Sequence, residues 1–171
     1  MKKLLLSMIL TSLSLFALNI GETPPLITLS GDNGGTVDGK EWNSSTLQGK
    51  LHVLFYVDPD KKGDNDQFIE ALHQKNYDPK KYGSIAIINL KATWLPNFAI
   101  EQKLKAKQQE YPNTLYVKDK TKYLVKEWGL ADDSANVLIF DKEGKLLYQH
   151  TGAMESNEQS KAFELIEKNL D

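Results

Sequence analysis

Carboxylates are concentrated in one short segment of the chain. Four of them lie within nine residues: Asp58, Asp60, Asp64 and Asp66. Carboxylate and carbonyl oxygens are the ligands that Ca²⁺ prefers, so this segment is a candidate cation-binding loop. It lacks the EF-hand pattern, because Lys62 and Ile69 occupy two of the ligand positions. The simpler interpretation, which we favour, is that Asp64 caps the following helix and its neighbours interact with the helix dipole.

Several chemistries are excluded by missing residue types. The chain has no cysteine, which rules out a thiolate nucleophile, a disulfide and a thiolate-bound metal. Thiol–disulfide oxidoreductase and thiol peroxidase activities are therefore excluded. The three histidines His52, His73 and His150 lack metal-binding spacing, and no Gly-x-Ser-x-Gly motif is present. We identify no catalytic residues and expect no cofactor.

Charge composition narrows the choice of partners. All 21 basic residues are lysines, so the planar guanidinium fork that binds anions through two parallel hydrogen bonds is absent. The formal net charge is −2, which gives no electrostatic footprint for DNA or RNA. We expect no nucleic-acid partner.

Apolar residues in a loop provide the best candidate binding surface. The segment from Trp94 to Phe98 places two aromatic side chains and Leu95 after a predicted strand, where loops are normally polar. Ser134, Ala135 and Asn136 are expected at the same edge of the sheet, and complete the candidate surface.

An Asn-x-Ser sequence begins at Asn43. In an exported protein it is a possible glycan acceptor, so Asn43 is a candidate modification site.

The first 17 residues have the pattern of a secretory signal peptide. Two lysines precede an apolar run that ends at Ala17 and is shorter than the roughly 20 residues needed to span a bilayer. An uncleaved N-terminal anchor is the alternative. We expect residues 1–17 to be removed, leaving a mature protein of residues 18–171 in the periplasm with no membrane association.

Hydrophobic periodicity predicts alternating strands and helices. After a turn-rich N-terminal extension over 21–46, the expected strands are Leu51–Val57, Ser84–Leu90, Leu115–Val117, Val137–Asp141 and Lys145–His150. The expected helices are 65–76, Phe98–Gln109, Tyr123–Trp128 and 156–170. This order predicts one α/β domain with a thioredoxin-like three-layer sandwich. Its mixed central sheet has helices on both faces, and the N-terminal extension forms a hairpin.

Short motifs in consistent order resemble the YtfJ family of exported bacterial proteins. They are Glu41–Ser44, Leu47–Lys50, Ala86–Asn89, Tyr111–Pro112, Glu127–Trp128, Ser134–Ala135, Phe140–Gly144 and Gly152–Met154. The resemblance implies a periplasmic, thioredoxin-like protein and brings no established catalytic residues. The turn after Val57 departs from the family pattern, which has small residues and an arginine there.

A more distant similarity to thiol oxidoreductases indicates which two segments of this chain correspond to their redox centre. Their cysteine pair would follow Val57, where this chain has an acidic loop, and Ala135 stands near the position of their cis-proline. We therefore expect a non-redox binding or adaptor module, with another periplasmic protein or a small ligand as partner. A divalent-cation-binding protein and an enzyme without thiol chemistry remain as alternatives.

Overall fold

The computed structural model describes residues 18–170, so the expected signal peptide and Asp171 lie outside the described residues. A six-stranded mixed sheet forms the centre. Its strands, in spatial order, are β2 (Gly34–Thr36), β6 (Thr114–Asp119), β5 (Tyr82–Asn89), β4 (Leu51–Val57), β7 (Ala135–Phe140) and β8 (Leu146–Thr151). Strands β4, β5 and β6 are parallel, while β2, β7 and β8 run antiparallel to their neighbours.

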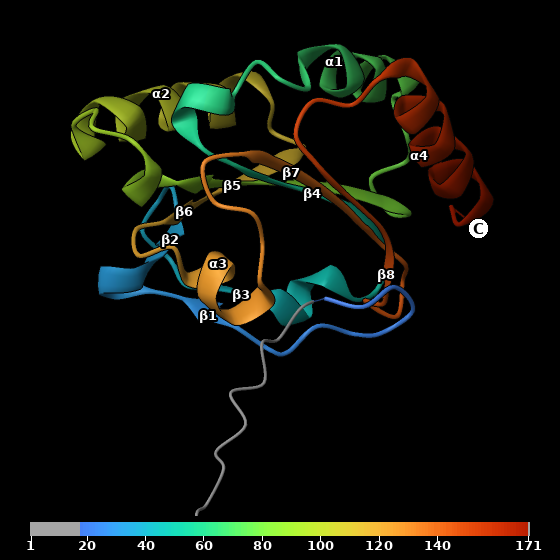
Figure 1. Cartoon of the computed structure of the whole chain (residues 1–171), viewed down its shortest axis with the longest axis horizontal. Coiled ribbons are helices and arrows are strands. Elements are labelled where there is room, and N and C mark those ends of the chain that lie inside the picture. Colours follow the sequence, from blue (N-terminus) through green and yellow to red (C-terminus); the bar gives the residue numbers. More distant parts are fainter. Residues whose placement is uncertain (1–17, 171) are drawn as a thin grey trace, which may run out of the picture.

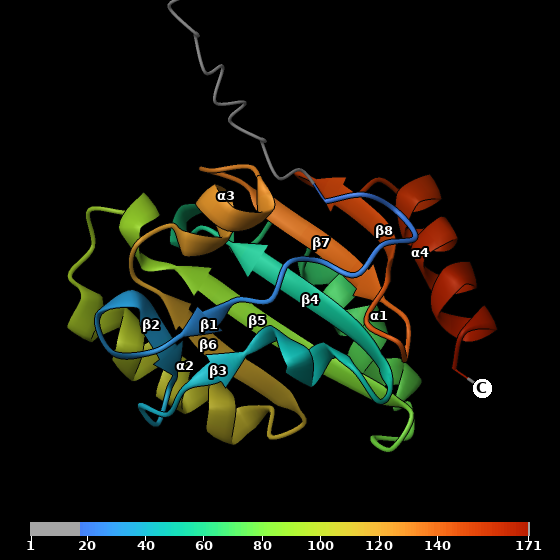
Figure 2. The same ribbon diagram turned by 90° about the horizontal axis from the view of Figure 1, so that it is seen from below.

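Helices cover both faces of this sheet, as the sequence predicts (Figure 1). One face carries α1 (Asp66–Lys75), α2 (Asn97–Glu110) and α4 (Ser156–Lys168). The other face carries the short helix α3 (Tyr123–Trp128) and the two-stranded pair β1 (Thr28–Leu29) and β3 (Trp42–Asn43), which are seen in front of the sheet in Figure 2. Within residues 18–170, no helix has the length and apolarity needed to cross a bilayer.

The central strands are buried on both faces, which explains their nearly continuous apolar sequence. Every residue of β7 is buried, as is every residue of β4 except Val57. Beneath α1 and α4, Phe68 and Ile166 belong to one core cluster. On the opposite face, Trp42 and Trp128 belong to a second cluster. Two cores on two faces give the three-layer sandwich.

The N-terminal extension differs from the expected hairpin. Strands β1 and β3 do pair antiparallel, but the chain between them departs to form β2 at the edge of the central sheet. Glycine allows this approach: Gly34 has φ 139°, and a Cβ atom there would lie 1.9 Å from the carbonyl oxygen of Lys118. A side chain at this position would prevent β2 from pairing with β6.

The start of α1 also differs from the sequence-based expectation. Asn65, and not Asp64, occupies the position before the first helical residue, and it makes no side-chain capping bond. The Asn65 amide instead donates to the carbonyl oxygen of Gly152 and accepts from the N–H of Met154. Asp64 is exposed to solvent. The proposed capping role of Asp64 is therefore wrong, because the chain turns into the helix one residue later.

Candidate functional site

Three polar side chains gather where the parallel strands end. Asp58 directly follows β4, Asn89 is the last residue of β5, and Asp119 is the last residue of β6. The register places Val57 opposite Ile88 and Asn89 opposite Asp119. The crevice at the carboxyl ends of strands is where open α/β sheets bind ligands. All three side chains are nevertheless fully buried.

The Asp58 carboxyl group is buried without a hydrogen-bond partner for either oxygen. Burial raises the pKa of Asp58 to about 6; the nearby Asn89 amide opposes the rise, and the negative charge of Asp132 adds to it. A buried carboxylate without compensation is costly, so such groups often belong to functional sites. At this pKa the group takes up and releases a proton near neutral pH.

Asp119 is also buried, but its carboxylate is fully satisfied. One oxygen accepts hydrogen bonds from the Tyr56 hydroxyl at 3.1 Å and from the backbone N–H of Leu124 at 3.0 Å. The other oxygen accepts from the N–H of Thr121 at 3.0 Å. Asp119 therefore fixes the start of α3 against β4, which makes it a structural residue.

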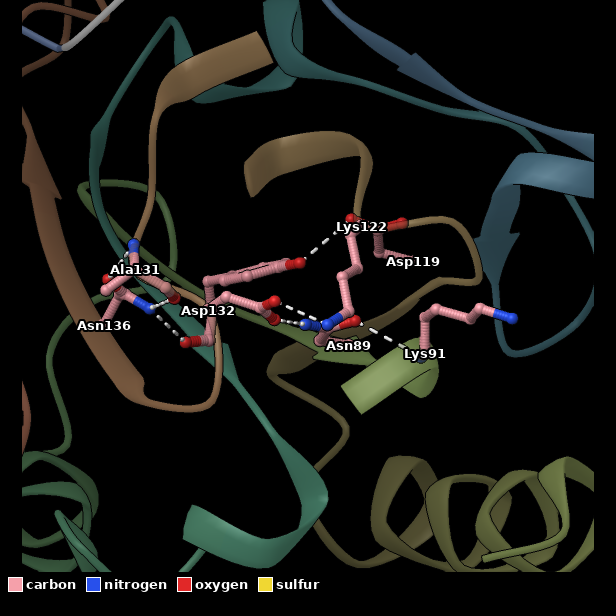
Figure 3. A network of polar contacts seen from close by, with 8 residues as sticks. Asn89, Lys91, Asp119, Lys122, Ala131, Asp132 and Asn136 are labelled. Atoms are coloured by element: carbon pink, nitrogen blue, oxygen red, sulfur yellow. Dashed lines mark hydrogen bonds and ion pairs between the residues drawn. The ribbon is translucent and has the colours of Figure 1, made fainter. Parts of the chain in front are cut away.

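Asp132 links the loop before β7 to the end of β5 (Figure 3). Its carboxylate accepts a hydrogen bond of 3.1 Å from the Asn89 side chain and forms an ion pair with Lys122. The Lys122 ammonium holds the pKa of Asp132 below its usual range. Lys122 and Asp133 both have left-handed backbone angles, with φ of 57° and 52°. Such conformations cost energy in non-glycine residues and are concentrated at functional sites.

The predicted surface residues before and within β7 are largely buried. Ala135 and Asn136 lie inside the sheet, and Ser134 is half-buried. Asn136 accepts from the N–H of Ala131 at 3.1 Å and donates to its carbonyl oxygen at 2.9 Å, which holds the loop that carries Asp132. Because Ala135 and Asn136 are buried, a partner could not contact them directly. These residues position the loop.

The two halves of the position expected for a redox centre do come together. Val57 and Ala135 are partners in the antiparallel register of β4 and β7. The backbone N–H of Asp58 also donates to the carbonyl oxygen of Ser134. A buried carboxyl group therefore occupies the place where the distant similarity puts a cysteine pair.

The two aromatic residues of the predicted binding loop are strongly exposed. Trp94, in the segment that joins β5 to α2, is 86% exposed, and Phe98, in the first turn of α2, is 69% exposed. Leu95, by contrast, is half-buried and packs on a small apolar cluster containing Leu90 and Ile100. Leu95 therefore anchors the loop, and the aromatic side chains extend from it into solvent.

The acidic segment does not assemble as a cation site. Asp58 is buried, whereas Asp60, Asp64 and Asp66 are exposed to solvent. Across residues 18–170, no group of three or more histidine, aspartate or glutamate side chains could hold a metal ion. These aspartates are close in the sequence, but their side chains do not come together in the fold.

The histidines lie on separate elements with separate contacts. His52 is buried in β4, with Nδ1 3.1 Å from the Leu47 carbonyl oxygen. His73 on α1 stacks on Tyr111, and His150 at the end of β8 lies 3.1 Å from the Ala153 carbonyl oxygen.

The glycan acceptor candidate Asn43 is half-buried in β3. Its amide nitrogen donates to the Thr28 hydroxyl at 2.7 Å, and its oxygen accepts from the N–H of Ser45. Modification of the folded protein would have to break the first of these bonds.

Comparison with known proteins resolves the family. A family model described as "Bacterial protein of unknown function (YtfJ_HI0045)" matches residues 26–169. The chain belongs to the YtfJ family. The curated relative "Uncharacterized protein YtfJ" of Escherichia coli strain K12 is 26% identical over 135 residues, covering 77% of this chain and 73% of the relative. An uncharacterized protein of Haemophilus influenzae is 24% identical over 157 residues, covering 87% and 85%.

Solved structures confirm the thioredoxin-like fold of this YtfJ-family protein. The exposed lipoprotein thioredoxin of Streptococcus pneumoniae superposes with a TM-score of 0.56 at 18% identity, covering 84% of this chain and 99% of that one. An identity this low shows the fold alone. The fold is therefore shared with thioredoxins, while the cysteines that their exchange chemistry requires are absent from this sequence.

Sequence reasoning missed the polar residues that surround Asp58. Asn89, Lys122 and Asp132 come from three separate segments, and no local motif connects them. One signal could have identified Asn89 as a neighbour of Asp58. Asn89 ends an apolar strand, and parallel strands place the residues at their carboxyl ends at the same edge of the sheet.

Proposed function

We propose that this protein is a periplasmic binding or adaptor module that recognises another exported protein without redox chemistry. The observation that carries the proposal is the exposure of Trp94 and Phe98, at 86% and 69%, in the loop before α2 and the first turn of that helix. Exposed aromatic side chains are the common anchors of protein interfaces. The signal-peptide pattern of residues 1–17 supports export.

Local contacts hold the base of this loop. The Asn89 oxygen accepts from the N–H of Lys91, and the Thr93 hydroxyl accepts from the N–H of Leu95. Leu95 packs into the apolar cluster below. A loop held in this way loses little conformational entropy when its aromatic side chains bind a partner.

In-cell crosslinking of the tagged full-length chain in its native host tests the proposal. The double variant Trp94→Ala/Phe98→Ala should lose a crosslinked partner that the original chain captures reproducibly. Leu26→Ala is the matched control, because Leu26 is 70% exposed in the N-terminal extension, outside this loop. Equal capture by the double variant and the original chain would contradict the proposed surface.

Cell fractionation tests the compartment. Full-length protein should be recovered in the periplasmic fraction, and a chain lacking residues 2–17 should remain in the cytoplasm. Cytoplasmic recovery of the full-length protein would contradict a periplasmic role.

A further inference from the structure

One face of β5 is incompletely covered. Along this strand, buried residues alternate with the half-buried residues Tyr82, Ser84, Ala86 and Ile88. Parallel strands in the middle of a sheet are normally buried on both faces, so this alternation is unusual. Helices α1 and α2 stand on the same face as these four residues, and the surface between them is hollowed. The exposed face of β5 forms the floor of that hollow.

The hollow consists of two connected chambers. The wider chamber has a volume of about 230 Å³ and the narrower one about 110 Å³. His73, Ser84 and Thr114 line both chambers, so the two chambers form one cleft, called here the α1–α2 cleft, between α1 and the C-terminal end of α2. From Tyr82 to Ile88 the floor is about 20 Å long, at roughly 3.3 Å per residue. The cleft is long and narrow, with its greater volume at the Tyr82 end.

The wider chamber is aromatic and polar. Tyr77, Tyr82 and Tyr111 contribute rings, and Asn113 and Thr114 contribute polar groups. This chamber can therefore pack a ring and bind hydroxyl or amide groups.

The wider chamber holds little net charge. Its one carboxylate, Glu110, lies 3.0 Å from the Lys107 ammonium in an ion pair. An uncharged ligand head therefore fits this chamber better than an anion or a cation.

The narrower chamber is apolar. Phe55, Val57, Ile69 and Ile88 line it, and the small side chain of Ala86 leaves the space open. The charged residue on its wall is Lys62, whose aliphatic stem can cover an apolar ligand while its ammonium stays in water. A short alkyl chain matches this shape and chemistry.

We propose that the α1–α2 cleft binds a small amphiphile with an uncharged polar head and a short alkyl or acyl chain. The head occupies the tyrosine-lined chamber, and the chain extends along β5 toward Ile88. This site is separate from the Trp94–Phe98 surface and does not depend on it. The ligand contacts are made by the floor of β5, by α1, and by the end of α2 with the segment that follows it, residues 110–114.

Titration calorimetry of the mature protein with octyl glucoside below its micelle concentration tests the proposal. We expect saturable binding, with amide NMR shifts at Ser84, Ala86 and Asn113. Ala86→Phe should weaken binding at least tenfold while retaining the melting temperature, because the new ring fills existing space. Ala86→Leu provides a smaller obstruction if phenylalanine disturbs the fold. Leu26→Ala, outside the cleft, should bind as the original chain does.

Three outcomes would overturn the proposal. The first is binding that appears only near the micelle concentration. The second is unchanged affinity in a folded Ala86→Phe or Ala86→Leu variant. The third is tighter binding of octanoate or octyltrimethylammonium than of octyl glucoside, which would contradict an uncharged head.

Discussion

The backbone N–H of Asp58 donates a hydrogen bond of 3.1 Å to the carbonyl oxygen of Ser134. This bond joins the loop that follows β4 to the residue that precedes β7. It lies where the distant similarity to thiol oxidoreductases places their redox centre. Here the same junction buries a carboxyl group that has no partner.

The first prediction concerns Asp58 and pH. The pKa of Asp58 is raised from 3.8 to about 6 in the folded protein, so the folded state binds the proton more tightly than the unfolded state. The contribution of Asp58 to stability should therefore fall as pH rises from about 4 to about 6 and remain lower above that range. In urea unfolding, Asp58→Asn should be more stable than the original chain by about 1–2 kcal/mol at pH 7.5. At pH 4 most of this gain should be absent.

The matched control for this prediction is Asp60→Asn. Asp60 is exposed two residues further along the same loop, so the change should alter the free energy of unfolding by less than about 0.5 kcal/mol. A pH-independent gain in Asp58→Asn, or no gain at any pH, would contradict the assigned cause.

The second prediction concerns Asn136. Asn136→Ala should lower the free energy of unfolding by about 2–4 kcal/mol, because it leaves the buried polar groups of Ala131 and Tyr56 without their partner. Chemical denaturation measures the loss. The exposed Asn19 gives a control, and Asn19→Ala should cost less than about 0.5 kcal/mol. A similar, small effect of both changes would show that the Asn136 network is dispensable.

The third prediction concerns the attachment of β2. Gly34→Ala should destabilise the protein by about 2 kcal/mol or more, because the new Cβ atom would lie 1.9 Å from the Lys118 carbonyl oxygen. Amide hydrogen exchange should show lost protection in β2 and in the β6 residues that pair with it. Gly63→Ala is the control, since its nearest neighbour would be 3.7 Å away. Retained protection in β2 would contradict this account.

The fourth prediction concerns divalent cations. A site with a dissociation constant near 10 μM would add about 2.7 kcal/mol of stability at 1 mM Ca²⁺. Because Asp60, Asp64 and Asp66 are exposed and do not converge with Asp58, we expect 1 mM Ca²⁺ or EDTA to leave the melting temperature unchanged. A rise of several degrees with Ca²⁺, lost in Asp64→Asn, would restore the cation-binding hypothesis.

Local patterns were sufficient for most of the fold. The apolar run Leu51–Val57 and the spacing of Phe68 and Leu72 identified β4 and α1, because burial there follows strand and helix periods. Strand β2 was not predicted, since its sequence Gly34-Gly35-Thr36 carries no strand pattern. Its pairing depends on close backbone approach to Lys118, which is a tertiary property.

The candidate site was less accessible to sequence reasoning. Asp58 was identified, but it was grouped with aspartates next to it in the chain. In the fold, its environment comes from Asn89 and Asp132, which follow other strands. Asn136 was expected at a surface and is instead buried, because the register of β7 against β4 sets its position. Side-chain alternation shows which residues share a face, but not which segments meet at the end of a sheet.

The two outer strands of the sheet affect how the protein behaves among other chains. β2 has only three residues, and the Leu146 end of β8 is covered by backbone hydrogen bonds to Gly21 and Glu22. Free strand edges recruit other polypeptides into intermolecular sheets, and short or covered edges resist this. Gly21 and Glu22, shortly after the expected cleavage point at Ala17, therefore protect this edge of the sheet from pairing with other chains. A cut that removed Gly21 and Glu22 would expose this end of β8 and make the protein more prone to self-association.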